Sequence, residues 1–288
     1  MRKFYSPLRY PGGKNRLAKF IALLCEKNHI GDTGGHYVEP YAGGASVAFF
    51  LLLNGHVAEV TINDSDRAIY AFWYAVLYHT EKLISRIQHT KIDEKTWRRC
   101  REVQRQKSTV ALFDLGFSTF FLNRTNISGI IDGGMIGGFS QKGKYKMDCR
   151  FNKKELIQRI TTIAAHKKNI HLHNLDALDL IDEVEKDGAG RTTIFYFDPP
   201  YYLKGESLYL NHYDHSDHER VSKAIRKIKN SRWVVSYDAT DEIDVLYKGL
   251  KKIEYYLLHT AHVARIGEEV LFFSKNMLVP RIADPTKV

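Results

Sequence analysis

Two stretches of alternating short apolar strands and helices, separated by a long segment of mainly helical pattern, constrain most strongly how this chain can fold. The first stretch extends to Asp66 and contains the strand HYVEP, the glycine loop YAGGAS, the apolar helix VAFFLLL and the strand VAEVTIND. A strand, a tight turn, a helix and a second strand form a βαβ unit, which builds parallel sheets. The stretch from 169 to 288 resumes the alternation. We therefore predict an α/β fold with a Rossmann-like, doubly wound sheet.

The segment between these stretches, residues 67–168, has a different character. Helical periodicity runs through IYAFWYAVLYHTEKLISRI and TWRRCREVQRQ, and few runs resemble strands. Its end, SGIIDGGMIGGFSQKGKYKMDCRF, is punctuated by glycines and is expected to form a β-hairpin or a flexible loop. We predict one domain over residues 1–66 and 169–288, interrupted by an inserted, mostly helical domain over residues 67–168 that bears the hairpin.

The formal net charge of +10 favours an anionic partner, either nucleic acid or an anionic membrane surface. Between Lys82 and Lys107, nine lysines and arginines stand against three acidic residues, so the positive charge gathers in the insertion. The most apolar run, Ala48 to Leu53, is far shorter than the ~20 residues that span a bilayer. We expect no membrane span, and the three widely spaced cysteines suggest reduced thiols in a cytoplasmic protein.

The sequence Asp198-Pro199-Pro200-Tyr201 directly follows the apolar strand IFYF. Buried parallel strands place ligand-contacting residues at their carboxyl ends. Because proline lacks an N–H group and restricts the residue before it, this loop presents carbonyl acceptors beside a carboxylate and an aromatic face. The arrangement suits an amino group carried on a ring. A strand-ending turn with a packed tyrosine accounts equally well for the four residues taken alone.

A second candidate site, Glu39 to Ser46, closes one strand and opens a helix. Its glycines let a ligand approach the backbone, and a helix N-terminus supplies free N–H groups. Asp64, at the end of the next strand, lies 21 positions beyond Gly43, a spacing that suits binding of ribose hydroxyls. The pattern is not GxGxxG, because Ala45 and Ala48 occupy the later positions. A nucleoside cofactor is predicted, and a packed β–α turn is the alternative.

The third candidate is YPGGK, residues 10–14. A solvated turn would explain it, and its two glycines resemble a phosphate-binding loop only superficially. The pattern GxxxxGK[ST] is absent, since Lys14 is followed by Asn15. We therefore exclude a P-loop ATPase.

The order of these motifs is more specific than any one of them. YPGGK, EPYAGGAS, IND, a basic helical insertion containing FLNRTNISG, DPPY and EEVLFF follow one another. In this order the chain resembles, over nearly its whole length, the Dam-type (D12 class) family of DNA adenine-N6 methyltransferases, in which the recognition domain is inserted before DPPY. Two departures are visible: Tyr10 and Tyr41 stand where relatives often carry Trp and Phe, and GGA replaces the commoner GAG or GGG.

The resemblance implies an enzyme that transfers a methyl group from S-adenosyl-L-methionine to the N6 amino group of an adenine flipped out of double-stranded DNA. Residues 198–201 would form the catalytic loop, in which Asp198 and the Pro199 carbonyl accept the two amino protons and Tyr201 stacks on the base. The residues implied in binding the methyl donor are Tyr10, Gly12, Gly13, Lys14, Glu39, Pro40, Tyr41, Gly43, Ser46, Asp64, Asp176 and Asp198.

The insertion is expected to position the DNA and to read its sequence, because basic helices contact phosphates and the segment 128–146 can enter a groove. Asn123 and Arg124 are equally suited to brace the base of the hairpin. Asp132 fits an Asx turn as well as a contact with a cytosine amino group. The candidate DNA contacts are Arg124, Asn126, Ser128, Asp132, Gln141, Lys142 and Lys144.

The spacing of His212, His215 and His218 superficially resembles a metal site, but no HExxH helix accompanies them. We predict no metal, and read this segment as a loop followed by a helix that is capped at Ser216 or Asp217.

Two other functions stay open, and an RNA substrate in place of DNA is a third possibility that the charge does not exclude. Methylation of cytosine N4 is the same amino-group chemistry, although the related cytosine enzymes more often carry Ser at the head of DPPY. A catalytically inactive DNA-binding homologue is the alternative outside enzymes. We expect a monomer in solution, and pairing with a restriction enzyme is open.

Overall fold

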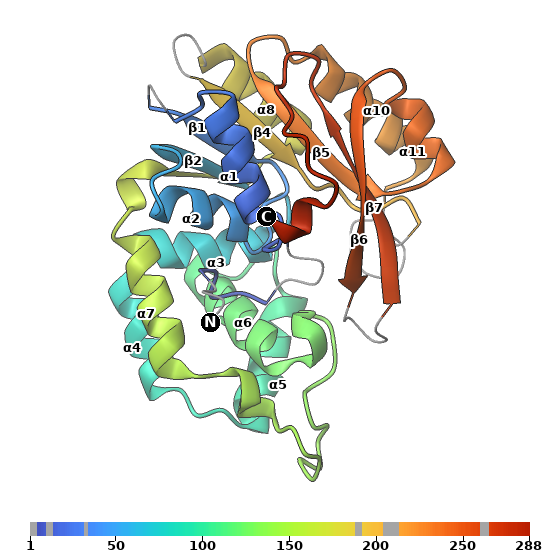
Figure 1. The fold of residues 1–288 in the computed structure, drawn as a ribbon. Helices are drawn as coiled ribbons and strands as arrows, with labels where there is room; N and C mark the ends of the chain where they lie inside the picture. Colours follow the sequence, from blue (N-terminus) through green and yellow to red (C-terminus); the bar gives the residue numbers. More distant parts are fainter. Residues whose placement is uncertain (1–4, 10–13, 32–33, 188–191, 204–212, 260–264) are drawn as a thin grey trace. The chain divides into compact units, whose positions relative to one another are not determined.

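The chain divides into two compact units. The computed structural model describes residues 5–9, 14–31, 34–187, 192–203, 213–259 and 265–288 (Figure 1). Unit 1 comprises Met1–Gly13 and Asp64–Asn174, and unit 2 comprises Lys14–Asn63 and Leu175–Val288. The predicted insertion, residues 67–168, thus falls within unit 1, which also takes in the N-terminal segment.

Unit 2 contains six strands of the seven-stranded sheet. They are β1 (His36–Glu39), β2 (Glu59–Asn63), β4 (Thr193–Phe197), β5 (Arg232–Asp238), β6 (Lys251–His259) and β7 (Arg265–Phe273). Their spatial order is β2-β1-β4-β5-β7-β6. The pairs β1–β2, β1–β4 and β4–β5 are parallel, whereas β7 runs antiparallel between β5 and β6. The predicted α/β, Rossmann-like sheet is confirmed.

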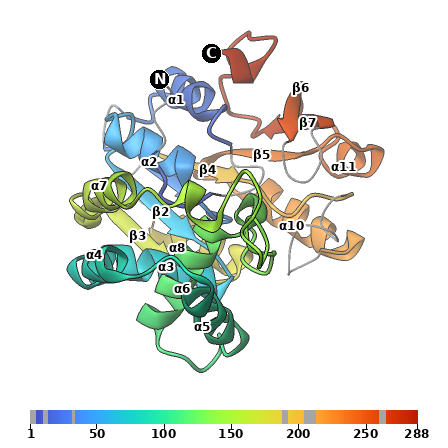
Figure 2. The same ribbon diagram turned by 90° about the horizontal axis from the view of Figure 1, so that it is seen from below.

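Helices cover both faces of this sheet, as the apolar composition of its strands requires. The helices of unit 2 are α1 (Ala18–Lys27), α2 (Ser46–Leu53), α8 (Ala177–Asp187), α10 (His215–Lys227) and α11 (Asp241–Leu246). Figure 2 shows α1 on one side of the strands and α10 on the other. Successive residues of β7 point to opposite faces of the sheet. The ring of Phe273 contacts that of Phe20 in α1 edge-on, with 6.3 Å between the ring centres. The ring of Phe272 stacks on that of Tyr247, with 4.9 Å between the ring centres.

This topology gathers polar residues at one edge of the sheet. Glu39 ends β1, Asn63 ends β2 and Asp238 ends β5, while Asp198 comes directly after β4. Because these four strands run in the same direction, their carboxyl ends lie along the same edge. Ligands of doubly wound sheets bind at this edge, so we look there for the site.

Unit 1 is mainly helical. Its elements are α3 (Arg67–Tyr78), α4 (Thr80–His89), α5 (Glu94–Arg105), α6 (Leu112–Thr125), α7 (Lys153–Ala164) and the strand β3 (Ile170–His173). Helix α6 is buried over nearly its whole length and packs against α3, where Phe72 and Phe120 stack at 5.7 Å. Gly116 allows this approach, because a Cβ there would lie 2.2 Å from the carbonyl oxygen of Ala71.

Of the two forms expected for the end of the insertion, a β-hairpin or a loop, the structure shows a loop with one antiparallel bridge at its base. Residues 128–146 are all described and contain no strand, and a single isolated bridge joins Asn126 to Met135. The backbone turns repeatedly instead, with positive φ angles of 80° at Gly137 and 62° at Gly138. Left-handed residues of this kind interrupt an extended ladder. We call the segment the 128–146 loop.

Two further expectations concern helices. Helix α10 begins at His215 and is capped by Asp214, which forms a capping box with Asp217, so the predicted cap at Ser216 or Asp217 lay slightly too late. His212 lies outside the described residues. In the part of the chain that is described, no group of three His, Cys, Asp or Glu side chains is arranged to hold a metal ion. None of the helices described is long and apolar enough to cross a membrane.

Candidate active site

The loop after β4 is held by side chains from neighbouring strands of unit 2. We call residues 198–203 the DPPY loop. The Asp198 carboxylate accepts a hydrogen bond of 2.7 Å from the Ser236 hydroxyl, which in turn accepts one of 3.1 Å from the Tyr196 hydroxyl. A quarter of the Asp198 side chain is exposed. The carboxylate is therefore fixed in orientation and still accessible from one side.

Asp238, at the end of β5, anchors the far side of the same loop. Its two carboxylate oxygens accept hydrogen bonds of 2.9 Å each, one from the Tyr202 N–H and one from the Leu203 N–H. Because Pro199 and Pro200 have no N–H groups, the loop has few backbone donors by which it could be held. Sequence reasoning missed Asp238, although an acidic residue that ends the strand RWVVSYD at the carboxyl edge is a usable signal.

Lys14 joins a buried ionic cluster beneath the DPPY loop. Its ammonium lies 3.4 Å from an Asp198 oxygen and 3.2 Å from a Glu269 oxygen, and it donates to the Tyr201 hydroxyl. Glu269 also accepts a bond of 2.6 Å from the Tyr255 hydroxyl. Lys14 was predicted to contact the methyl donor, but its partners here belong to the DPPY loop and to β7. The contact with the donor stays a prediction.

The charges of this cluster shift each other's ionisation. Burial alone would lower the pKa of Lys14, but the Asp198 and Glu269 carboxylates outweigh it and raise that pKa above its usual value. Burial raises the pKa of Asp198, while the Lys14 ammonium and the Ser236 hydroxyl oppose this rise. One cation is thus shared by two carboxylates, and Lys14 stays protonated at neutral pH.

Tyr201 is the residue that was predicted to stack on the flipped base. Its side chain is buried, with 6% exposed, and the Lys14 ammonium lies 4.6 Å from the centre of its ring. Stacking on a base therefore stays a prediction. Leu203, two residues further on, is 70% exposed and is the most accessible apolar side chain of the DPPY loop.

The glycine loop after β1 turns sharply into α2. Gly43 and Ala45 both have a φ of 47°, in the left-handed region that costs a residue with a Cβ roughly 1–2 kcal/mol. The Glu39 carboxylate accepts bonds from the Tyr37 hydroxyl at 2.8 Å and from the Ala48 N–H at 3.2 Å. Burial raises the pKa of Glu39 to about 8, although both hydrogen bonds oppose this rise. Glu39 thus holds the loop against the first turn of the helix.

Asn63 ties this glycine loop to the segment that precedes α8. Its side-chain amide donates to the Pro40 carbonyl at 2.9 Å and to the Leu175 carbonyl at 3.1 Å, and accepts from the Leu175 N–H at 2.9 Å. Its own carbonyl accepts the Ala42 N–H at 2.8 Å. Sequence reasoning singled out Asp64 of the IND motif and missed the buried asparagine before it.

Tyr41 and Asp176 lie near each other at this edge of unit 2. The Tyr41 hydroxyl is 3.3 Å from that of Tyr213, and the negative charge of Asp176 contributes to the raised pKa of both tyrosines, behind the dominant effect of burial. Asp176 is exposed and accepts the Leu178 N–H at the start of α8. Ser46, the first residue of α2, is partly exposed.

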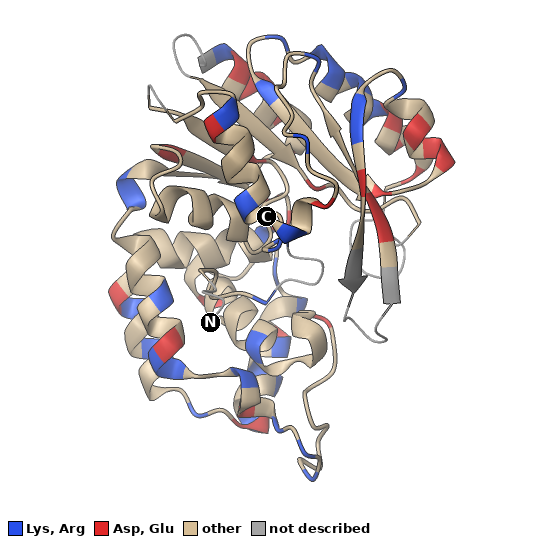
Figure 3. Ribbon diagram, in the orientation of Figure 1, with Lys and Arg blue, Asp and Glu red and all other residues tan. Residues whose placement is uncertain are grey.

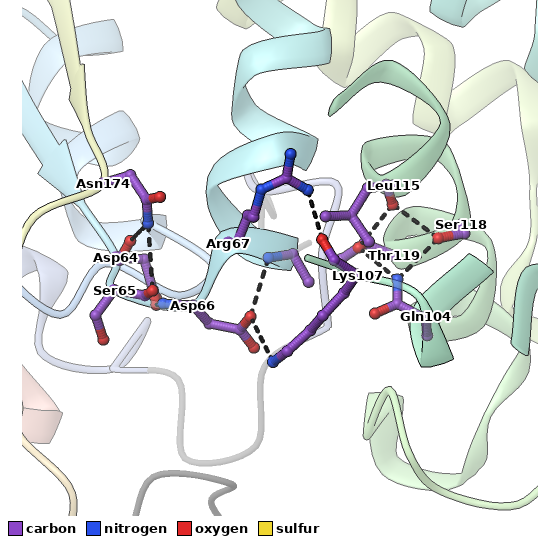
Figure 4. Close-up of polar contacts among 11 residues, drawn as sticks. Asp64, Ser65, Asp66, Arg67, Gln104, Lys107, Leu115, Ser118, Thr119 and Asn174 are labelled. Atoms are coloured by element: carbon purple, nitrogen blue, oxygen red, sulfur yellow. Dashed lines mark hydrogen bonds and ion pairs between the residues drawn. The ribbon is translucent and has the colours of Figure 1, made fainter. Parts of the chain in front are cut away.

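Asp64 falls within unit 1, where it shapes the start of α3 (Figure 4). Its carboxylate accepts the Asp66 N–H at 2.9 Å, and Asn174 donates to its carbonyl at 2.7 Å. Asp66 caps α3 and pairs with Lys107 at 3.3 Å. The predicted ribose contact of Asp64 stays a prediction. Of the YPGGK motif, Tyr10, Gly12 and Gly13 lie outside the described residues.

The polar residues that end α6 point inward and hold the N-terminal segment. Arg124 is 7% exposed, donates to the Pro7 carbonyl at 2.7 Å, and has its pKa lowered to about 9 by burial. Asn126 is fully buried; it accepts from the Trp97 indole at 2.7 Å and donates to the Ile130 carbonyl at 2.9 Å. Arg124 thus holds the N-terminal segment and Asn126 holds the base of the 128–146 loop, and their predicted contacts with DNA stay predictions.

Asn123 makes the same kind of brace. Its amide accepts from the Arg9 N–H and donates to the Arg9 carbonyl, each at 2.7 Å, and it donates to the Gly129 carbonyl at 2.8 Å. Asn123 thus joins the backbone of Arg9 to the 128–146 loop, and the Arg9 guanidinium also donates to the Asn126 carbonyl at 3.4 Å.

Within the 128–146 loop the predicted contacts divide into two groups. The Gln141 amide is used internally: it donates to the Ile136 carbonyl at 2.8 Å and accepts the Met147 N–H at 2.9 Å. Lys142 and Lys144 are exposed, and Figure 3 shows lysines along this extended part of the chain. Asp132 is exposed and pairs with Arg101 at 3.2 Å. Ser128 is partly exposed, with a φ of 56°.

The comparison with known families now decides between the open functions. The sequence pattern of the D12 class N6 adenine-specific DNA methyltransferases matches residues 10–261, which is most of the chain. The protein belongs to this family. A curated relative, the Type II methyltransferase M.MjaIII of Methanocaldococcus jannaschii, is 26% identical over 247 residues, which cover 77% of this chain and 79% of the relative. The predicted enzyme class, an adenine-specific DNA methyltransferase, is confirmed.

Similar solved structures include other methyltransferases. The S-adenosylmethionine-dependent methyltransferase of Agrobacterium tumefaciens aligns with 91% of this chain at 11% identity and a TM-score of 0.39, and this chain spans 62% of its length. The rRNA methyltransferase aviRa of Streptomyces viridochromogenes aligns with 92% of this chain and 86% of its own length, at 14% identity and a TM-score of 0.42.

This D12 methyltransferase uses S-adenosyl-L-methionine as its cofactor. The glycine loop fits such a group on two observations. The left-handed turn at Gly43 and Ala45 opens directly onto the N-terminus of α2, and Ala45, the N-cap residue, offers no side-chain oxygen to the helix N–H groups. The buried Glu39 and Asn63 hold this turn rigidly.

Proposed function

We propose that this methyltransferase acts on an adenine that has been rotated out of duplex DNA, and that the amino group of this base is held by Asp198 and the carbonyl of Pro199. Rotation is needed because in the duplex one amino proton is hydrogen-bonded to thymine and stacked neighbours cover both faces of the base, so the carboxylate, the carbonyl and the methyl donor cannot surround the nitrogen. The coarser activity, adenine-specific DNA methylation, is that of the family.

The chemistry of the amino group defines what the loop has to do. The N6 lone pair of adenine is delocalised into the ring, so the nitrogen is a poor nucleophile while it stays planar. Hydrogen bonds from the two amino protons to a carboxylate and a carbonyl favour a tetrahedral nitrogen and stabilise the positive charge that develops on it. When bound, S-adenosylmethionine supplies a methyl group on a sulfonium, which is already a good leaving group.

One observation carries the proposal. The Asp198 carboxylate lies at the end of β4 with its orientation fixed by Ser236 and Lys14, and a quarter of the side chain is exposed. Directional, partly desolvated acceptors of this kind stabilise charge far better than a mobile carboxylate in water does. Asp238 fixes the same loop from its other side.

Unit 1 supplies the features that duplex binding needs. Exposed lysines and arginines on α5 and in the 128–146 loop suit contacts with phosphates, whereas the neutral groups inside that loop maintain its shape. We therefore propose that residues 67–168 bind DNA and select the target sequence, and that residues of unit 2 hold the cofactor and the target base.

The test compares Asp198→Asn with Asp182→Asn, which changes an exposed aspartate of α8. Each variant is incubated with duplex DNA and S-adenosylmethionine, and the nucleosides are then analysed by mass spectrometry. Asp198→Asn is expected to lower the methylation rate on the order of 100- to 1,000-fold, with an unchanged melting temperature. A near wild-type rate for Asp198→Asn would contradict the catalytic assignment. Product appearing as N4-methylcytosine would contradict the proposed target.

A further inference from the structure

Glu269 is the most deeply buried acidic residue around the DPPY loop. Its side chain has no exposed surface, and it lies on β7 in the EEVLFF motif, for whose residues no role was predicted. A buried carboxylate is costly unless it is paired and hydrogen-bonded. The Lys14 ammonium at 3.2 Å and the Tyr255 hydroxyl at 2.6 Å provide that pairing.

The position of β7, antiparallel between β5 and β6, explains how this carboxylate reaches the DPPY loop. Glu269 pairs in register with Asp238 of β5, so both residues face the same side of the sheet at the level where the parallel strands end. The neighbouring Glu268 is exposed and pairs instead with Tyr256 of β6. The strand thus presents one acidic residue to the DPPY loop and the next to solvent.

We propose that Glu269 is a positioning residue for methyl transfer: together with Tyr255 it fixes the Lys14 ammonium, which in turn holds the Asp198 carboxylate and the Tyr201 hydroxyl in place. This proposal rests on the catalytic role proposed for Asp198. Lys14 has a long, flexible side chain, and without Glu269 its ammonium would be held only by Asp198 and Tyr201, the two groups that it has to position. With both carboxylates present, the ammonium lies 3.2 Å from Glu269 and 3.4 Å from Asp198 and is held by both.

If Glu269 acts through its charge, its removal should change the pH dependence of the rate, whereas the loss of a packing contact should not. Glu269 places a second negative charge near Asp198, and this charge raises the pKa of Asp198. If the charge of Glu269 is removed, Asp198 is the remaining carboxylate partner of Lys14 among the described contacts of the cluster. The ionised form of Asp198 is then favoured. The acidic limb of the pH–rate profile, where Asp198 gains a proton, should therefore move to lower pH.

The experiment uses the full-length enzyme and compares Glu269→Gln with Glu268→Gln. Glu269→Gln is expected to lower kcat on the order of tenfold to 100-fold, because the acceptor for the amino group is displaced. It should also move the acidic limb of kcat to lower pH, with KM for duplex DNA and for S-adenosylmethionine nearly unchanged. Glu268→Gln should leave kcat and the pH profile at their wild-type values. Glu269→Asp, which keeps the charge, should restore part of the rate and shift the acidic limb of the kcat profile back toward its wild-type pH.

The possible outcomes separate this proposal from the one on which it rests. If Asp198→Asn is inactive while Glu269→Gln keeps its kcat and its acidic limb, Glu269 has no positioning role and the catalytic role of Asp198 stands. If Asp198→Asn is active, the proposed function fails first. Should Glu269→Gln not fold, Tyr255→Phe replaces it, since this change removes the 2.6 Å hydrogen bond and leaves the charge. A wild-type kcat in a folded Tyr255→Phe enzyme would then overturn the proposal.

Discussion

The DPPY loop and the 128–146 loop are both irregular segments, yet they are held in opposite ways. Charged groups fix the DPPY loop: Asp238 binds two of its N–H groups, and Lys14 contacts Asp198. Neutral amides hold most of the 128–146 loop: Asn126 at its base and Gln141 within it bind backbone groups. Arg101 adds a hydrogen bond to the Ile131 carbonyl and an ion pair with Asp132, and lysines remain exposed.

The difference matches what each loop is proposed to do. Catalysis depends on charges that are oriented before the reaction and shielded from water, where a displacement of about 1 Å can cost about 100-fold in rate. Binding to phosphates depends on exposed cations and tolerates movement of the chain. Substitutions beneath the DPPY loop should therefore lower the rate steeply, and substitutions of exposed lysines should lower affinity gradually.

Among changes to the residues that hold the two loops, the largest effect is expected from Asp238→Ala, which leaves the Tyr202 and Leu203 N–H groups without their acceptor. The DPPY loop should lose its fixed position, so kcat should fall about 100-fold. Binding of S-adenosylmethionine should persist, because the glycine loop is held separately by Asn63. The measurements are kcat at saturating substrates and cofactor binding by calorimetry. The exposed Glu242 supplies the control, Glu242→Gln.

A kcat within a few-fold of wild type for Asp238→Ala would show that the DPPY loop keeps its shape without this anchor. The contrast between the two loops would then rest on Lys14 and its partners alone. Lost cofactor binding would show instead that the two loops at the edge of unit 2 are coupled.

A smaller effect is expected from Asn63→Ala, and it should change the Kd for S-adenosylmethionine and not kcat. This change removes the side chain that joins the Pro40 carbonyl to Leu175. The glycine loop should become less rigid once these three hydrogen bonds are lost, so the Kd for S-adenosylmethionine should rise about tenfold, which corresponds to about 1.4 kcal/mol. At saturating cofactor kcat should stay near wild type. Asn54→Ala, in an exposed asparagine after α2, serves as the control. An equal fall in kcat would place Asn63 in the catalytic step.

The sequence predicted the residues that follow local patterns. Asp198 and Glu39 come at the ends of apolar strands, so the alternation of strands and helices is enough to place them at the carboxyl edge of the sheet. Glu269 could not be placed in this way. It reaches the site because β7 inserts antiparallel between β5 and β6, and it contacts Lys14 across 255 positions of sequence.

The 128–146 loop shows a different limit. Its glycines correctly indicated turns. Ser128 and Gln141 also adopt positive φ angles, of 56° and 49°, which their residue types do not predict. For Arg124 the sequence left a contact with DNA and a structural brace equally open, and for Asn126 only the contact with DNA was predicted. Both side chains are buried. They are buried because backbone carbonyls accept their hydrogen bonds, and a sequence pattern does not reveal such partners.

The smallest effect is expected from the double change Lys142→Ala and Lys144→Ala in the 128–146 loop. Each lysine that neutralises a phosphate releases counterions from DNA, so the slope of log K against log salt concentration should become shallower by about 0.9 per lost contact. Affinity should fall by a few-fold, equally for target and non-target duplexes, and kcat at saturating DNA should not change. The control removes two exposed lysines of unit 2, Lys248 and Lys251. If the loop variant lost discrimination between duplexes while its salt slope stayed constant, these lysines would read bases, and specificity would not depend on the neutral framework inside the loop. If kcat fell as steeply as expected for Asp238→Ala, the contrast between a loop that orients charge and a loop that only attracts phosphate would fail.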